Sequence, residues 1–568
     1  MIQEDSSTLI IILILFLLAL ILPFNKKHFK NLETLLHKIA LKKYLVILAI
    51  GVITFLSNLA VAKSFYWPIP AVNDEFGYLL LSDTFCQGRL TNPVHPMWIH
   101  FEAFHITKEP TRTAKFPPGQ GIALAIGQKL TGYPIVGVWL SMSLAIMALY
   151  WMLQVWVPPR WALFGTLLFI LKLGIFTYWS QSFWGGAVAL LGGALVFGAL
   201  RRIIKKPAIN NSLFFALGLA ILANSRPYEG FILSLCAIIW LVICLVKKKA
   251  FPTSLLLKQV FLPITLSMII VIISMGYYNW VVTGKAWLMP HQLYESTYNK
   301  YPLFIWLKPS NKVIEYNNKE FELVHTIWFS KHFNSNFDPP YNFLRLSVSK
   351  IIFLAKFFLD YITGFFLLFL FLLVKNKWTR FAFVSLLILL LGILQIAFVV
   401  LPHYIAPGVC LLYFLIIQGM RYVYVWSWRA RATGKLLVWF VPIYYICLIF
   451  YLISVGVNPS TIFSYYPTGI ARYERSHWSF ARENLISDLN KLEKKSLVIV
   501  KYRQHNIHEE WIYNEVDIDK AKVVWARSLS PEKDCQLIKY FSDREIWIVE
   551  ISSTIDSIRK ADLSKLCP

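Results

Sequence analysis

The chain has 568 residues, of which 57% are hydrophobic, 16% aromatic and only 15% charged. This composition excludes a soluble enzyme and a disordered chain, and it is typical of a protein embedded in lipid. On a soluble protein the net charge of +25 would point to nucleic acid. The positions of the charges indicate a different origin.

Basic residues gather in the short polar breaks between apolar runs. These breaks hold 21 Lys and Arg against a single acid, Glu33. Basic loops of this kind face the cytoplasm, so the excess charge indicates orientation in a membrane, and no nucleic-acid partner is expected. The breaks are residues 25–43, Arg160, 201–206, 247–249, 375–380 and 421–435.

Placing these breaks in the cytoplasm predicts about twelve transmembrane helices, because the apolar runs approach the roughly 20 residues that cross a bilayer. The first run follows the acidic pair Glu4–Asp5 and has no basic start, so it is interpreted as a retained span and not as a signal peptide. The run 211–224 is short and could be tilted, broken or re-entrant. The predicted spans are 8–24, 44–62, 134–157, 161–178, 184–200, 211–224, 229–246, 259–281, 352–374, 381–401, 403–420 and 436–456.

Three segments on the predicted outer side are too long to be simple connections: 63–133, 283–349 and the tail 457–568. Function is expected there. In the tail, residues 472–494 have helical spacing and strand-like runs follow, which predicts a compact α/β domain. The strand-like runs are 496–500, 522–525 and 545–550.

The expected fold class is therefore an α-helical polytopic membrane protein over residues 1–456, with a small C-terminal extracytoplasmic α/β domain over 457–568. Cys535 and Cys567 both lie in that domain, where an oxidising compartment would permit a disulfide. No metal-ligand spacing of cysteines occurs in the sequence. Gly192–Gly193 is typical of close packing between spans.

The first outer segment begins with Asn73-Asp74-Glu75, two adjacent carboxylates just beyond a predicted span. If residues 75–88 form a helix, Asn73 or Asp74 is a natural N-cap, and this interpretation needs no chemistry. A turn of the Lys-x-Pro-Pro type follows within Lys115–Gly121.

Together, Asp74-Glu75 and Lys115–Gly121 resemble motifs of the large membrane glycosyltransferases of the GT-C fold. The similarity is greatest to the branch containing protein O-mannosyltransferases and the aminoarabinose transferase of lipid A. This resemblance implies that Asp74 and Glu75 are catalytic, with Asp74 as general base, and that the donor is a polyprenyl-phosphate-linked sugar. The extra span 8–24 departs from the family plan.

A departing lipid phosphate chiefly needs positive charge and hydrogen-bond donors. Lys115 and Arg112 are the nearest candidates in the sequence, with Arg89, His95 and His105 behind them. The alternative for Arg89, Arg112 and His105 is that they are solvated loop residues.

A second group of candidates lies at the mouths of predicted spans. Arg226 and Glu229 at membrane depth are costly unless they pair or face water, so they either brace a turn as an ion pair or Arg226 binds phosphate or sugar. His403 is either a phosphate ligand or an interfacial histidine. The aromatic residues of 283–349 serve as interfacial anchors, as a sugar platform or as a cover, and the sequence does not separate these.

The sequence thus predicts a glycosyltransferase of the inner membrane that acts outside the cytoplasm, on a lipid, glycan or protein acceptor. No cofactor is certain, and a divalent metal is left open. The alternatives are a transporter or lipid flippase, whose hallmark is repeats and discontinuous helices, and a non-catalytic membrane protein that binds glycans.

Overall fold

The computed structural model describes residues 29–65, 67–248, 251–339, 342–429, 431–454, 477–503, 509–552 and 555–561, together with Leu17 and Ile21. The predicted first span, 8–24, otherwise lies outside the described residues, as does the predicted domain boundary at 456.

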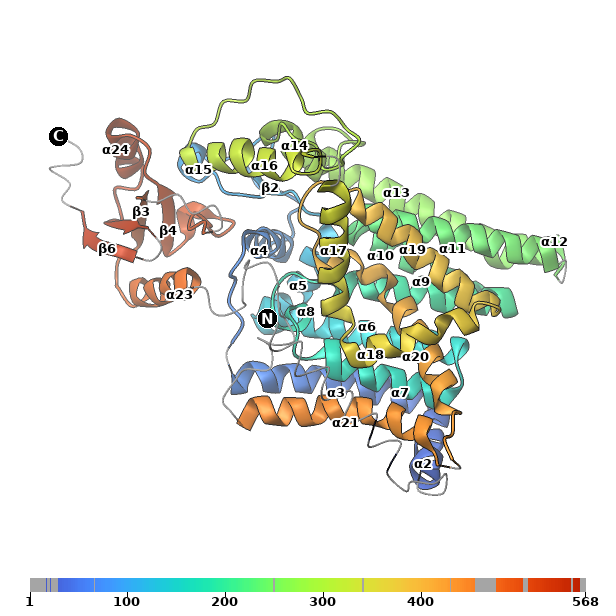
Figure 1. Ribbon diagram of the computed structural model, residues 1–568. Coiled ribbons are helices and arrows are strands. Elements are labelled where there is room, and N and C mark those ends of the chain that lie inside the picture. Colours follow the sequence, from blue (N-terminus) through green and yellow to red (C-terminus); the bar gives the residue numbers. More distant parts are fainter. Residues whose placement is uncertain are drawn as a thin grey trace.

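The protein is a mostly helical integral membrane protein with a small sheet domain at its C-terminal end (Figure 1). Among the described residues, eight helical segments are long and apolar enough to cross a membrane, or nine if one bent pair is a single span, so the count of twelve is not reproduced. The eight are α3 (Lys43–Ser64), α6 (Pro134–Trp156), α9 (Ala187–Lys205), α11 (Pro227–Lys248), α12 to α13 (Thr253–Thr283), α19 (Lys377–Leu394), Ala406–Tyr424 with α20 (Val409–Tyr424), and α21 (Thr433–Ser454).

Two of the predicted spans form shorter helices. Residues 161–178 are divided among α7 (Pro159–Phe169), a π-helical turn (Ile170–Gly174) and α8 (Tyr178–Gln181). Residues 211–224 form one continuous helix, α10 (Ile209–Ser225), which packs against α9. The predicted alternatives of a broken or re-entrant segment are therefore wrong for α10.

The predicted span 352–374 is not one straight helix, because α17 (Asn342–Phe358) and the helix that begins with α18 (Tyr361–Leu367) meet at 107°. Figure 1 shows α17 running across the direction of the long helices. Asp360 causes the break: its carboxylate accepts the N–H of Thr363 at the start of α18, and Lys172 Nζ lies 2.8 Å from its other oxygen. The new helix α18 therefore begins at Asp360 with its own cap, and its axis is not continuous with that of α17.

The next predicted span, 403–420, is also displaced along the chain. After α19 ends at Leu394, the chain is irregular up to two 3₁₀ turns, Pro402–Tyr404 and Ala406–Gly408, and α20 begins at Val409. At the second turn, a Cβ on Gly193 of α9 would lie 1.9 Å from the Pro407 carbonyl oxygen. The predicted close packing at Gly192–Gly193 is thereby confirmed.

The two long loops predicted to lie on the outer side, 63–133 and 283–349, here called the outer loops, contain short helices. In the first loop, α4 (Asn73–Cys86) and α5 (Pro118–Thr131) flank a two-stranded ribbon, β1 (Ile106–Thr107) and β2 (Thr113–Ala114). The second loop contains α14 (Pro290–Tyr298), α15 (Lys319–Glu322) and α16 (Phe329–Asn334).

The C-terminal domain contains a four-stranded sheet in the order β4-β3-β5-β6. Strands β3, β4 and β5 are parallel, and β6 is antiparallel to β5. The sequence predicted the helix and the first three strands, whereas α24 and β6 were not predicted. The elements are α23 (His477–Asn490), β3 (Ser496–Tyr502), β4 (Val523–Arg527), α24 (Pro531–Tyr540), β5 (Glu545–Ile551) and β6 (Ile555–Lys560). Cys535 of α24 is disulfide-bonded, and its predicted partner Cys567 lies outside the described residues.

Segments predicted to share one side of the membrane meet in the structure. At the outer end, Arg527 of the C-terminal domain pairs with Glu320 of the second loop at 2.6 Å. At the opposite end of α3, Glu33 pairs with Arg160 at 3.4 Å and also with Lys435. Three of the predicted cytoplasmic breaks therefore meet around the single acid that they contain.

The predicted orientation has a direct test in intact cells. We expect a membrane-impermeant maleimide to label Lys539→Cys on the exposed surface of α24 and to spare Lys375→Cys in a predicted cytoplasmic break. A background in which Cys86, Cys236, Cys244, Cys410 and Cys447, the described cysteines outside a disulfide, are replaced avoids unrelated labelling. Labelling of position 375 with protection of position 539 would reverse the orientation.

Candidate active site

Glu75 closes the first turn of α4 with its side chain. Its carboxylate accepts the N–H groups of Ala71 at 2.7 Å and Val72 at 3.2 Å, and it also accepts the N–H of Phe183 at 2.9 Å. Burial raises the pKa of Glu75 to about 7, against these three hydrogen bonds. Glu75 thus satisfies helix-end donors and ties α4 to the segment between α8 and α9.

The predicted N-cap at Asn73 or Asp74 is wrong. Helix α4 begins at Asn73, so Asn73 and Asp74 both lie inside the helix. Its N-cap residue is Val72, whose side chain makes no capping bond. The capping function belongs to Glu75, which reaches back to the preceding turn. The Asp74 side chain is therefore not needed to begin the helix.

Asp74 is the accessible member of the acidic pair, with its side chain 33% exposed. Its Oδ2 lies 3.6 Å from Nε2 of His105, at the start of the β1–β2 ribbon. Burial raises the pKa of Asp74, while Lys115 and Arg226 act to lower it. A carboxylate with a raised pKa beside two cations is suited to accept a proton.

Two backbone hydrogen bonds hold His105 in place, and its imidazole ring is uncharged. It has a left-handed φ of 66°, its N–H donates to the Tyr294 hydroxyl at 3.1 Å, and its carbonyl accepts the Lys115 N–H at 2.8 Å. Burial and then the charge of Lys115 hold the pKa of His105 well below its usual value. His105 therefore lies next to Asp74 as a neutral imidazole, not as a phosphate-binding cation.

Lys115 joins the two outer loops at the site. Its Nζ lies 3.2 Å from Oε1 of Glu295 and 4.7 Å from the centre of the Tyr294 ring, both on α14. Although burial acts to raise the pKa of Glu295, Lys115 and His291 hold it below its usual value, so the Lys115 partner is charged. Tyr294 and Glu295 were missed in the sequence, where only the aromatic content of 283–349 gave a signal.

Arg226 lies between α10 and α11 with its guanidinium 4.9 Å from the centre of the Tyr404 ring. Within the described part of the chain, Arg226 and Glu229 form no ion pair within 4.0 Å, and Glu229 is buried. The predicted direct brace between them is therefore absent there. Tyr404 was not predicted as a neighbour of Arg226.

His403 is buried near Arg226 and is hydrogen-bonded to Tyr178. The Tyr178 hydroxyl lies 3.0 Å from Nδ1 of His403 and also accepts its backbone N–H. Burial and then Arg226 hold the pKa of His403 well below its usual value, so the ring is neutral. The neutral His403 ring therefore lies against the Tyr178 hydroxyl.

The structure places Arg112 and His95, two of the predicted substrate-binding residues, against the C-terminal domain. The Arg112 guanidinium donates to the carbonyls of Asn514, Glu515 and Val516 at 3.0 to 3.2 Å. His95 Nε2 lies 3.0 Å from Oδ1 of Asp519. Both side chains are occupied by the C-terminal domain, so they are docking residues. Arg89 has the same role, since it pairs with Asp517 at 2.7 Å.

The aromatic residues of the second loop divide into two sets. Tyr294, Tyr298 and His325 are buried together with Phe104 and Phe321, so they form a small core and not an open sugar platform. Trp287 and Trp306 are exposed. As for metals, no group of three His, Cys, Asp or Glu suited to hold an ion occurs in the described residues.

Comparison with known proteins gives structural neighbours only. No protein-family model and no curated protein matches the chain. The chain is similar to the crystal structure of ArnT from Cupriavidus metallidurans bound to undecaprenyl phosphate, with 11% identity, a TM-score of 0.44, and coverage of 89% of this chain and 92% of that chain. It is also similar to the oligosaccharyltransferase AglB from Archaeoglobus fulgidus in complex with an inhibitory peptide and a dolichol-phosphate, with 11% identity, a TM-score of 0.40, and coverage of 90% and 69%.

Both neighbours are GT-C fold membrane glycosyltransferases, the class that the sequence resembles. Both TM-scores lie below 0.5, so the evidence for a function comes from the chain's own residues.

Proposed function

We propose that the protein is a membrane glycosyltransferase that moves a sugar from a polyprenyl-phosphate donor to an acceptor outside the cytoplasm, at the inner membrane. The observation that supports this most is that the two adjacent carboxylates, Asp74 and Glu75, have different environments. Glu75 is committed to the backbone, whereas Asp74 is accessible, beside a neutral histidine and within the electrostatic influence of Lys115 and Arg226.

In the proposed reaction, Asp74 accepts the proton of the acceptor hydroxyl as its oxygen attacks the anomeric carbon of the donor sugar. The bond between that carbon and the phosphate oxygen breaks, and the lipid phosphate leaves with the electron pair. Lys115 and Arg226 are placed to compensate its negative charge. The acceptor can be a lipid, a glycan or a protein, and release of undecaprenyl phosphate from a panel of undecaprenyl-phosphate sugars tests the reaction.

We expect Lys115→Ala and Arg226→Ala each to weaken binding of undecaprenyl phosphate by about tenfold or more, because a charge-assisted contact to a phosphate contributes roughly 1.5–3 kcal/mol. Binding to the purified protein in detergent is the measurement. Lys377→Ala, at an exposed cation on the predicted cytoplasmic side, is the matched control and should bind as the wild type does.

The double variant Arg226→Ala with Glu229→Ala shows whether Arg226 binds the donor phosphate or only stabilises the protein by offsetting Glu229. If the double variant regains both stability and donor turnover, Arg226 only offsets the buried charge of Glu229 and leaves the site. If stability returns without turnover, Arg226 acts at the donor phosphate.

One feature favours the alternative of a transporter. The break between α17 and α18 lies next to the ion pair of Lys172 and Asp360, and broken helices beside buried charges are typical of transport pathways. Flux measurements in liposomes separate the two functions: substrate movement that survives Asp74→Asn would favour transport, and chemical transfer that requires Asp74 would favour the enzyme.

A further inference from the structure

We propose that Tyr513 of the C-terminal domain is a positioning residue that sets the geometry of Asp74 and His105. This inference rests on the proposed function, in which Asp74 is the general base. It gives the C-terminal domain a part in the active site, a role that neither the sequence motifs nor the resemblance assigns to it.

The first contact is between rings. The Tyr513 ring is stacked on the Phe76 ring of α4, with centroids 4.0 Å apart and planes inclined by 1°. Phe76 lies two residues after Asp74 in the first turn of α4 and is buried. Stacking of this kind adds to the burial of both rings, so it fixes the turn that carries Asp74.

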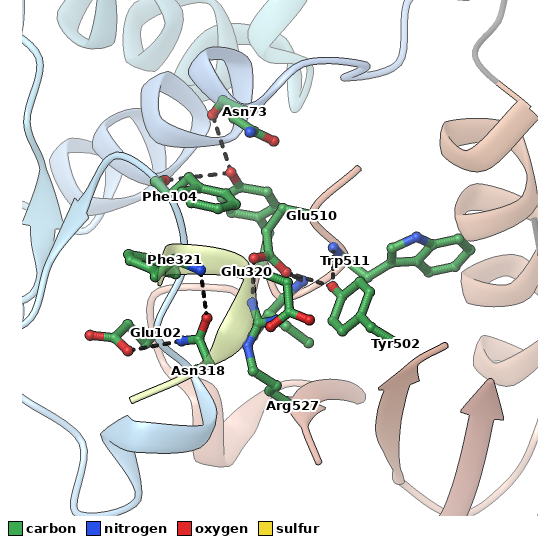
Figure 2. A network of polar contacts seen from close by, with 12 residues as sticks. Asn73, Glu102, Phe104, Asn318, Glu320, Phe321, Tyr502, Glu510, Trp511 and Arg527 are labelled. Atoms are coloured by element: carbon green, nitrogen blue, oxygen red, sulfur yellow. Dashed lines mark hydrogen bonds and ion pairs between the residues drawn. The ribbon is translucent and has the colours of Figure 1, made fainter. Parts of the chain in front are cut away.

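The second contact is made by the hydroxyl group. It lies 3.5 Å from the Asn73 carbonyl oxygen and 3.4 Å from the Phe104 carbonyl oxygen, as Figure 2 shows for both acceptors. These two residues immediately precede Asp74 and His105, which face each other at 3.6 Å. A single side chain therefore touches both backbone segments that carry the pair.

Tyr513 is itself held rigidly by its own domain. Arg482 of α23 donates to the carbonyl of Tyr513 at 2.8 Å and to that of Trp511 at 3.3 Å. The amide of Asn514 exchanges two hydrogen bonds of 2.8 Å with the backbone of Trp525 on β4. The position of the Tyr513 ring is therefore determined by the sheet.

The domain also reaches the second outer loop through a buried network (Figure 2). Arg527 of β4 pairs with Glu320 at 2.6 Å and with Glu510, and Glu510 accepts the Tyr502 hydroxyl at 2.6 Å. Both outer loops thus contact the same domain, and Tyr513 is the residue of that domain whose hydroxyl lies beside the carbonyl oxygens preceding Asp74 and His105. A displacement of about 1 Å at a catalytic group can cost roughly a hundredfold in rate.

The test compares three variants by rate per folded enzyme. Tyr513→Leu removes the ring and Tyr513→Phe keeps the stack. Asp519→Ala removes a docking contact to His95, a residue outside α4. We expect Tyr513→Leu to lower kcat by about tenfold or more, with little change in donor KM, because the donor contacts are intact. We also expect the acid limb of its pH profile to move to lower pH, because water then reaches Asp74.

The same assay gives the outcome for the other two variants. Tyr513→Phe should recover most of the wild-type kcat, and Asp519→Ala should leave kcat and the pH profile unchanged. A wild-type rate and profile in Tyr513→Leu, or an equal loss in Asp519→Ala, would overturn the proposal. Absence of transfer by the wild type across the donor panel would instead count against the proposed function.

Discussion

Replacing Asp74 with Asn should abolish sugar transfer while the protein remains folded and inserted. The amide keeps the size of the side chain but cannot accept a proton, and a positioned general base contributes typically 10²–10⁴-fold to the rate. Because Asp74 makes no capping bond, the change should leave α4 intact. Transfer by membranes with matched protein abundance is the measurement.

The pH dependence of the wild type should agree with this role. The pKa of Asp74 is raised, and only the ionised carboxylate accepts a proton, so kcat should fall as the pH falls through that raised pKa. The acid limb should be absent from any residual activity of Asp74→Asn.

Glu75→Gln is the matched control at the neighbouring carboxylate. It replaces one of the oxygens that accept the N–H groups of Ala71, Val72 and Phe183, so we expect less folded protein and a largely retained kcat per folded molecule. Full activity in Asp74→Asn together with a loss of kcat in Glu75→Gln would exchange the two assignments.

Arg527→Met should destabilise the outer part of the protein by about 3–5 kcal/mol, because it removes the cation between two buried carboxylates. The Arg527, Glu320 and Glu510 side chains are all less than 10% exposed. We expect a lower unfolding temperature in detergent and faster proteolytic release of the C-terminal domain.

The matched control for this change is Arg559→Ala on β6, whose side chain is 63% exposed and lies 3.8 Å from Glu550. A surface pair of this kind contributes at most about 1 kcal/mol. Equal destabilisation by the two variants would contradict the buried-network interpretation. The triple variant that also replaces Glu320 and Glu510 with Leu should recover much of the loss.

The overall class could be predicted because hydropathy and charge act locally along the chain. Apolar runs and basic breaks predicted the polytopic architecture, and short strand-like runs predicted β3, β4 and β5. The break at Asp360 was not predicted, because Asp360 caps α18 within an otherwise apolar run and its ion-pair partner Lys172 lies 188 residues away. The apolar run on either side of Asp360 has the hydropathy of a continuous span.

The sequence predicted which part of the chain carries the candidate site, but not the contacts of its individual residues. The acidic pair pointed to the outer end of α3, yet only the geometry separates Glu75, which accepts backbone N–H groups, from Asp74, which faces His105. Arg112 and His95 carry the charge and chemistry of phosphate ligands, and their actual partners are more than 400 residues later in the chain. Spacing in the sequence gives no information on contacts of that range.

The contact of Tyr513 with Asn73, 440 residues apart, has a consequence for biosynthesis. A ribosome delivers α4 and its acidic pair early, long before the residues that pack on them. During that interval the first outer loop lacks the ring that stacks on Phe76 and the carbonyls that bind Arg112. Because domains tend to fold in the order of synthesis, the pair of Asp74 and His105 acquires its final geometry only after Tyr513 and the strands that hold it have been made, so truncated chains inserted in the bilayer would lack that geometry.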